Sequence, residues 1–326
     1  MRVEIWADVV CAWAYIGKRR LAKALTGWDG PPVEVVWRPF RIDPAAPTPG
    51  TPIAELYRDP LVDEALRACN PGLSPAQNRI RVSEIAAAEG LGPPWGAAWR
   101  ASSQHAHRLI ALAEQHGGAE LQDAVVERVL RAHFIDGADI SDLAVLADVA
   151  RQAGFADGPR LLDTGAGEDL VRERLLTGEG IGVRTSPSIV LGRRALAGAQ
   201  SPEAIREFLA AGAVDPALRP PAEVERLRHA ESLLDQGDPL GALTLLRPLL
   251  VEYGTDRGVR TLAARAYYAS AQLNRARAAL EQLVAEAPDD SYARHLLGRT
   301  LRRQGAHAEA AVQLRLAAAM NPSYAG

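Results

Sequence analysis

The sequence predicts an α/β domain followed by an all-α repeat array, and three observations carry this prediction. The apolar run "VEIWADVV" (3–10) leads into a cysteine and then directly into a basic segment with helical spacing. Beyond residue 222, small and apolar residues recur with a period of 34 residues. Between the two patterns, "AGAVDPALRPPA" (211–222) is rich in Ala, Pro and Gly without an amphipathic period. We therefore expect it to be a linker.

Composition limits the class of protein. The chain has 326 residues, of which 48% are hydrophobic and 24% charged, and this is enough for two globular domains. The net charge of −3 makes neither nucleic acid nor an anionic membrane an expected partner. No uninterrupted apolar run reaches about 18 residues, so no membrane span is predicted. With only two cysteines and no signal-like N-terminus, the sequence predicts a cytoplasmic protein.

The elements of the first half follow in order. We expect a strand at 3–10, a helix at 13–25 and a second strand at 33–40. From about 52 to 180 the periodicity is mostly helical, with Ser141 as the expected N-cap of one helix. "SPSIVLGRRALAGAQ" (186–200) predicts two short strands around a turn. A closing helix begins at the cap Ser201 and ends at Gly212.

The second half is built from three 34-residue units that start at 223, 257 and 291. Their eighth and twentieth positions hold small residues, which let two antiparallel helices approach closely, while larger apolar residues fill the space beside them. These positions are Ala230, Ala264 and Gly298, then Ala242, Ala276 and Ala310, with Leu246, Leu280 and Leu314 at the twenty-fourth. This pattern resembles the tetratricopeptide repeat over 223–324, although Gly254 replaces the proline that ends the other units.

Such repeats are binding surfaces, so a protein or peptide partner is expected. The alternative is that the array packs on the first half or on another copy of the chain. Three units without an evident capping helix leave an apolar end, which favours docking or a homodimer.

The first half resembles the DsbA-like thioredoxin-fold family, in particular its FrnE-type branch. The matching segments are "DVVCAWAYIGKRR", "WRPFRIDP", "AHRLIALA" and "SPSIVLGRRALAGAQSPEAI", and together they span nearly all of 1–210. The resemblance implies a thioredoxin sheet with a helical domain inserted at about 52–180. It also implies that Ser186 and Pro187 form the cis-proline turn facing the reactive site.

The family motif Cys-Pro-Trp-Cys stands here as Cys11-Ala12-Trp13-Ala14. The attacking cysteine is present and the resolving one is replaced by Ala14, so a mixed disulfide on Cys11 must be released by another molecule such as glutathione. A thiol at a helix start is expected to have a lowered pKa, and we expect it to be accessible. The resemblance therefore implies a single-thiol oxidoreductase with no bound cofactor and with glutathione as cosubstrate.

Two other functions stay open. In glutathione-dependent 2-hydroxychromene-2-carboxylate isomerases and kappa-class transferases, which are similar in fold, a serine occupies the reactive turn without a second cysteine. In that layout Cys11 would orient the thiolate of bound glutathione. The other possibility is a redox-inactive adaptor that acts through its repeats, with Cys11 a buried inert thiol.

Further candidates are weaker. Three residues are possible contacts to substrate or glutathione: Ser102, which stands where the related proteins are expected to have asparagine, His107 and Arg38. The alternatives are a hydrogen-bonded core histidine for His107 and a solvated loop for Arg38. Cys69 is either a distant resolving thiol or filler. An aromatic substrate pocket could be lined by Trp13, Trp95 and Trp99, or these could fill the core. Arg41, like Arg38, could hold an anionic ligand or lie in a solvated loop. No group of His, Cys, Asp and Glu has metal-ligand spacing, so no metal is predicted.

Overall fold

The computed structural model describes residues 1–56, 58, 72–212 and 220–325. The chain forms two compact units. The first contains Met1–Gly178 and the segment from Val183, and the second contains Glu179–Gly182 and the residues from Pro220 onward. The predicted linker lies mostly outside the described residues, since only its ends are described.

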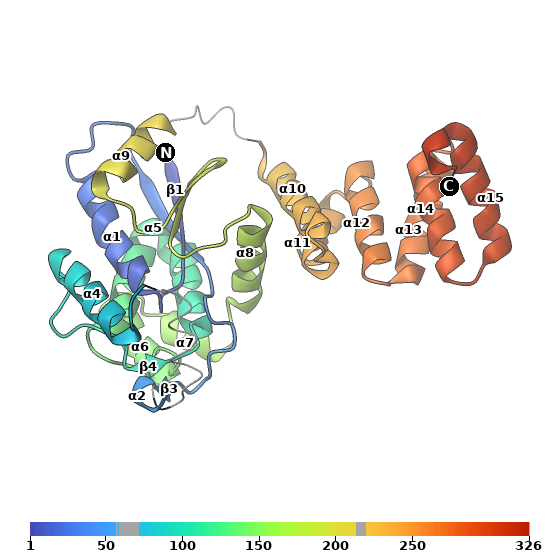
Figure 1. The fold of residues 1–326 in the computed structure, drawn as a ribbon. Coiled ribbons are helices and arrows are strands. Elements are labelled where there is room, and N and C mark those ends of the chain that lie inside the picture. The colour runs from blue at the N-terminus through green and yellow to red at the C-terminus, as the bar shows by residue number, and fades with distance from the viewer. Residues whose placement is uncertain (57, 59–71, 213–219, 326) are drawn as a thin grey trace. The chain divides into compact units, whose positions relative to one another are not determined.

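The first unit is organised around a four-stranded sheet in the order β2-β1-β5-β6 (Figure 1). β1 (Arg2–Ala7) and β2 (Glu34–Pro39) are parallel, whereas β5 (Ser188–Leu191) pairs antiparallel with β1 and with β6 (Arg194–Ala197). The first strand is shorter than predicted, because the chain turns after Ala7. The four strands confirm the thioredoxin-type sheet that the sequence resemblance implied.

Both faces of β1 are covered, because its neighbouring residues Ile5 and Trp6 are both buried. Ile5 lies on the face covered by α1 (Ala12–Leu25) and α9 (Pro202–Ala211), where it shares a small crevice with Leu21 and Ile205. Trp6 points to the opposite face, where α8 (Glu168–Gly180) is so close that a Cβ on Gly178 would come within 2.6 Å of the Trp6 ring. The side-chain alternation of a strand therefore sends neighbouring residues into two separate packed layers.

The segment between β2 and β5 is mainly helical, as predicted. Its described helices are α2 (Ile53–Leu56), α4 (Pro75–Ala88), α5 (Gln104–Phe134), α6 (Leu143–Gln152), α7 (Gly158–Asp163) and α8. α5 is kinked where Gly118 takes φ +67°, a value that side chains other than glycine rarely allow.

Two details of this segment differ from the sequence predictions. Asp142, not Ser141, caps α6, because its carboxylate accepts the backbone N–H of Ala144. Helical periodicity also missed a short antiparallel pairing of β3 (Thr51–Pro52) with β4 (Trp99–Arg100). Strands of two residues are too short to produce a periodic pattern.

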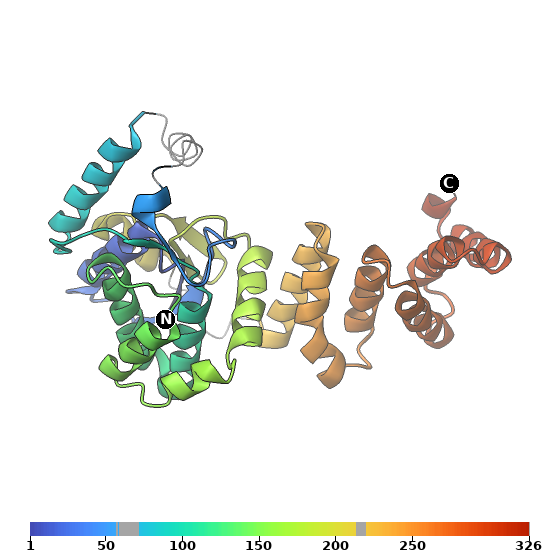
Figure 2. The same cartoon turned by 90° about the horizontal axis from the view of Figure 1, so that it is seen from below.

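The second unit consists of three antiparallel helix pairs, visible in both views (Figures 1 and 2). A Cβ at Gly298 would come within 2.6 Å of Leu314, so the small eighth position is required for close packing. Ala264, Ala276 and Ala310 are likewise buried in the core between helices. The helices are α10 (Ala222–Asp235), α11 (Pro239–Glu252), α12 (Arg257–Ala269), α13 (Leu273–Glu286), α14 (Ser291–Arg303) and α15 (His307–Met320), followed by the 3₁₀ turn η2 (Pro322–Tyr324).

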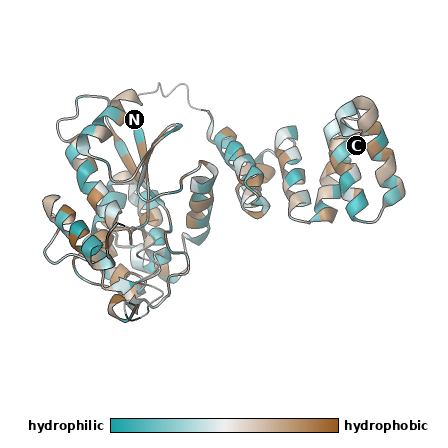
Figure 3. Cartoon of the chain, viewed as in Figure 1, coloured by the Kyte–Doolittle hydropathy of each residue, from teal (hydrophilic) through white to brown (hydrophobic). Residues whose placement is uncertain are grey.

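Hydrophilic and hydrophobic residues mix along the helices of both units (Figure 3). Over the residues that the structure describes, none of the helices has the length and apolarity that crossing a membrane demands.

Candidate active site

Cys11 occupies the N-cap of α1, directly after the turn that follows β1. Its backbone N–H donates to the carbonyl of Asp8 at 3.0 Å, and its carbonyl accepts from Ala14 N–H at 2.9 Å. With φ −88° and ψ 116°, the cap residue is extended, as N-caps are. The parallel strand therefore delivers the sulfur to the end of the helix at which backbone N–H groups are unpaired.

The turn before β5 covers this thiol. The Ser186–Pro187 peptide bond is cis, and the Cys11 thiol donates to the Ser186 carbonyl with Sγ and O 3.4 Å apart. The Ser186 hydroxyl in turn accepts the backbone N–H of Asp8 at 2.9 Å. A Cβ on Gly17 would come within 3.3 Å of Pro187 Cγ, so the glycine lets α1 lie close to the turn.

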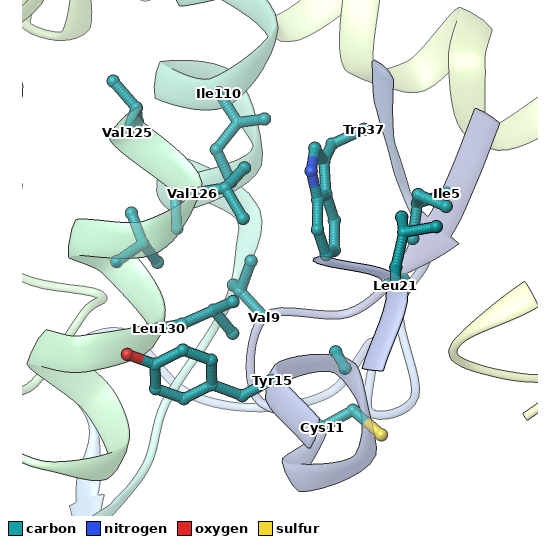
Figure 4. Close-up of a cluster of buried hydrophobic side chains, with 14 of the residues drawn as sticks. Ile5, Val9, Cys11, Tyr15, Leu21, Trp37, Ile110, Val125, Val126 and Leu130 are labelled. Carbon is teal, nitrogen blue, oxygen red and sulfur yellow. The ribbon is translucent and has the colours of Figure 1, made fainter. Parts of the chain in front are cut away.

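The expected exposure and pKa of Cys11 are both corrected by the structure. Cys11 is only 9% exposed, and its sulfur points away from Tyr15 and Leu130 at the edge of the core cluster (Figure 4). Burial raises the pKa of the Cys11 thiol, and the negative charge of Asp8 adds to the rise. A hydrogen bond from the Ser186 side chain and bonds from the N–H groups of Ala14 and Trp13 favour the thiolate, as the helix start predicted, but desolvation outweighs them.

A buried carboxylate lies behind the reactive turn. Asp8 is 1% exposed, and its Oδ1 is 3.3 Å from His107 Nε2 while its Oδ2 accepts the Ile42 N–H at 2.8 Å. His107 Nε2 is also 3.0 Å from the Phe40 carbonyl. Since both neighbours of Nε2 are acceptors, Nε2 carries the hydrogen. Burial raises the pKa of Asp8, but the hydrogen bond and charge of His107, with the bonds from Ile42 and Ser103, hold it below its usual value.

A second histidine borders this group. His133 is 1% exposed, and burial lowers its pKa to about 4, although the charges of Asp8 and Asp139 act in the opposite direction. Its ring meets Phe134 edge-on, with centroids 4.7 Å apart. His133 is therefore neutral at physiological pH and behaves as a core side chain.

The remaining residues of the predicted site lie in different surroundings. Ala14, in the place of the second sulfur, is 1% exposed. It lines a crevice with Gly17 and Pro187 that has about 10 Å³ of room, enough for roughly one water molecule. Ala12 and Trp13 are partly buried against the core. This crevice beside Ala14 is therefore too small to hold a substrate.

Ser102 and Arg38 have structural partners. Ser102 is buried, and its hydroxyl accepts weakly from Gln104 N–H at 3.4 Å. The Arg38 guanidinium, which was a candidate for binding an anionic ligand, instead pairs with Glu4 at 3.0 Å and with Glu114 at 2.6 Å. These two carboxylates neutralise the arginine, so it is not free to hold a substrate anion.

The tryptophans belong largely to the core. Trp95 stacks on Phe134 with centroids 5.0 Å apart, and Trp99 Nε1 donates to the Gly137 carbonyl. Arg41 donates to the Pro44 carbonyl of its own loop. Cys69, the candidate distant resolving thiol, lies outside the described residues.

Sequence reasoning missed Asp8 and Ser103 as parts of this site. The signal for Asp8 was present, since an aspartate inside an apolar strand run is costly to bury without partners. Ser103 carries no comparable signal, because only the fold brings the start of α5 to the end of β1.

Comparisons with known proteins agree with the fold. The model of the DSBA-like thioredoxin domain matches residues 2–210, and a tetratricopeptide repeat model matches residues 233–300. The uncharacterized protein YwbO of Bacillus subtilis (strain 168) is 25% identical over 204 residues, which cover 61% of this chain and 90% of YwbO.

Among solved structures, the probable DsbA oxidoreductase SCO1869 from Streptomyces coelicolor is 30% identical with a TM-score of 0.54, covering 68% of this chain and 92% of that one. The cytosolic disulfide reductase DsbM from Pseudomonas aeruginosa, solved with GSH, is 19% identical with a TM-score of 0.42, covering 65% and 98%. A likeness that low transfers nothing about glutathione to this chain. The match over 2–210 decides the family: the chain belongs to the DSBA-like thioredoxin domain family, and tetratricopeptide repeats follow this domain.

Proposed function

We propose that the chain is a thiol–disulfide exchange protein that works through the single thiol of Cys11, with glutathione releasing what the thiol captures. The observation that carries the proposal is the position of Cys11 at the N-cap of α1, with its sulfur 3.4 Å from the Ser186 carbonyl and Ala14 where a second thiol would stand. Family membership and the likeness to SCO1869 support thiol chemistry at this turn.

The reaction is two successive exchanges. The substrate is a mixed disulfide between glutathione and a protein, and the Cys11 thiolate attacks its glutathione sulfur. The S–S bond of the substrate breaks, a new S–S bond forms between Cys11 and glutathione, and the protein leaves as a thiolate. A free glutathione thiolate then attacks the adduct, takes the bound glutathione as glutathione disulfide and restores Cys11. In total, one glutathionylated protein and one free glutathione give the protein thiol and one glutathione disulfide, so the substrate sulfur is reduced and one glutathione thiol is oxidised.

The buried site makes deprotonation of Cys11 the demanding step. Because its pKa is raised, only a small fraction of Cys11 is thiolate at neutral pH, and the exchange rate should rise with pH. The repeats would compensate by holding the partner protein near the site, since tethering increases the effective concentration of its disulfide.

One observation favours a second candidate, a glutathione-dependent isomerase or transferase. A thiol with a raised pKa stays protonated and can donate a hydrogen bond, as it does to Ser186. Such a donor could orient the thiolate of bound glutathione without forming a covalent bond. The two candidates therefore differ in whether the Cys11 sulfur itself becomes linked.

Intact-mass measurement separates the candidates. After incubation with glutathione disulfide, single-thiol exchange predicts one glutathione adduct on the peptide that contains Cys11, absent in Cys11→Ser and removed by reduced glutathione. The isomerase candidate predicts no adduct but saturable binding of reduced glutathione in calorimetry. Absence of both would leave the adaptor role, in which only the repeats act.

A further inference from the structure

The first helices of the second and third repeats, α12 and α14, present a row of cationic and aromatic side chains. On α14 the row follows helical spacing and therefore lies on one side of the helix. α12 packs beside α14 and contributes a tyrosine to the same side. We call this surface the arginine–tyrosine face; it consists of Tyr268, Tyr292, His295, Arg299, Arg302 and Arg303.

Three arginines without a carboxylate partner gather on this one face. Four other arginines of the repeats pair with carboxylates: Arg257 with Asp290, Arg260 with Glu286, Arg265 with Glu231 and Asp235, and Arg277 with Glu281 and Glu309. Within residues 220–325, no carboxylate lies within ion-pair distance of Arg299, Arg302 or Arg303. The face therefore keeps three uncompensated positive charges, all of them exposed.

Tyr268 holds two of these guanidinium groups in place. The Cζ atoms of Arg299 and Arg303 lie 5.2 Å and 4.8 Å from the centroid of its ring. Arg303 also donates to the Tyr268 carbonyl at 2.9 Å. Cation–π contacts of this kind restrict the arginine rotamers before any ligand arrives, which reduces the entropy lost on binding.

The charges are close to one another, and the face has a defined border. Burial and the positive charges of Arg299 and Arg302 lower the pKa of His295, which places both charges near its ring. Tyr324 stacks on His295 with centroids 4.3 Å apart, so η2 closes that side of the row. Tyr292 remains 37% exposed beside the histidine. The free part of the face is thus short, cationic and partly aromatic.

We propose that the arginine–tyrosine face binds an acidic peptide segment of a partner protein. The inference rests on the proposed function, because it names the kind of protein that the repeats would bring to Cys11. Planar guanidinium groups bind carboxylates through paired hydrogen bonds, and the exposed Tyr292 at the start of α14 offers apolar contact on the same side of the helix. A nucleic acid fits less well, since it needs a basic surface that continues along its backbone, and Arg257 and Arg265 on α12 are neutralised by carboxylates.

The test uses the full chain and a fluorescein-labelled peptide of alternating glutamate and alanine, followed by fluorescence anisotropy. Its counterpart with glutamine in place of glutamate measures the contribution of charge. We expect saturable binding of the acidic peptide only. The combined variant Arg299→Ala, Arg302→Ala and Arg303→Ala should weaken it about tenfold or more, since three exposed ion pairs are lost. Alanine is a good helix former, so the helical circular dichroism should not change.

The matched control removes Arg247 and Arg315, which are exposed on α11 and α15 and have no ion pair within the described repeats. The control variant should bind the acidic peptide as the unmodified chain does. Equal binding of the glutamine peptide, an equal loss in the control variant, or tighter binding of single-stranded RNA to the same arginines would overturn the proposal. The glutathione adduct on Cys11 is measured by mass spectrometry in the same samples. This measurement tests the proposed chemistry independently of peptide binding, because none of the substituted residues lies in the first unit.

Discussion

The side chains of Asp8 and His107 meet inside the first unit, with Oδ1 and Nε2 3.3 Å apart and both residues nearly inaccessible to solvent. This contact joins the end of β1 to α5, two elements 99 residues apart in sequence. Asp8 also accepts from the Ile42 backbone and donates its own N–H to Ser186. One aspartate thus links the strand, the helical segment and the turn that covers the thiol.

Asp8→Ala should destabilise the first unit by about 3–5 kcal/mol, because the Ile42 N–H loses its acceptor and the buried His107 loses its carboxylate partner, keeping only the Phe40 carbonyl. Urea unfolding followed by tryptophan fluorescence measures this directly, since all six tryptophans lie in the first 99 residues. Asp8→Asn is the matched control, as it keeps an acceptor oxygen of the same shape, and it should cost less. A loss below about 1 kcal/mol in Asp8→Ala would show that the contact is not a stabilising link.

Glu114 should make the first unit sensitive to acid. It pairs with Arg38, Arg174 and Arg2, and although burial raises its pKa, these partners hold the pKa below the usual value. A pKa lower in the folded than in the unfolded state adds stability above the unfolded value of about 4.3, and this stability disappears as the pH falls through the folded pKa. Glu114→Gln should therefore lower the urea midpoint at pH 7 and flatten its decline toward about pH 3. An unchanged pH profile would contradict this assignment.

Alkylation of Cys11 should show a pH midpoint above that of a free cysteine, because burial raises the thiol pKa. Iodoacetamide labelling of the peptide that contains Cys11, quantified by mass spectrometry over a pH series, separates it from Cys69. Unfolding in urea supplies the control, since it should return the midpoint to the ordinary thiol value. A midpoint in the folded protein below that of a free cysteine would contradict this prediction and support the lowered pKa expected from the helix start alone.

The contrast between Cys11 and its surroundings shows what the sequence could predict. The strand, the helix start and the missing second sulfur at Ala14 are local features, so residues 3–25 were sufficient to predict them. The burial of the thiol depends on Ser186, 175 residues away, and on the packing of Pro187 against α1. Desolvation of the thiol results from tertiary packing. The local sequence predicted only the opposite effect, a lowering of the thiol pKa at the helix start.

Arg38 gives the same lesson on the far side of the sheet. Its partners Glu4 and Glu114 come from β1 and α5, and no spacing in the sequence pairs them. The repeats behave differently, because each helix packs on its sequence neighbours. Their periodic small and large residues were therefore enough to predict three helix pairs.

Ala14→Cys should convert the site from single-thiol to dithiol chemistry. Residues 11 and 14 are one helical turn apart, the separation at which a disulfide can close, and the crevice beside Ala14 leaves room for a sulfur atom. Glutathione disulfide should then produce an internal disulfide, seen as the loss of two hydrogens in the intact mass, where the unmodified chain keeps a glutathione adduct. The internal thiol displaces glutathione because its effective concentration exceeds that of glutathione in solution.

Ala14→Ser is the control: it adds similar volume without a thiol and should keep the glutathione adduct. If Ala14→Cys also keeps the adduct, the geometry at the start of α1 does not let the second thiol reach Cys11, and replacement of the resolving cysteine cannot be what makes the chain a single-thiol protein.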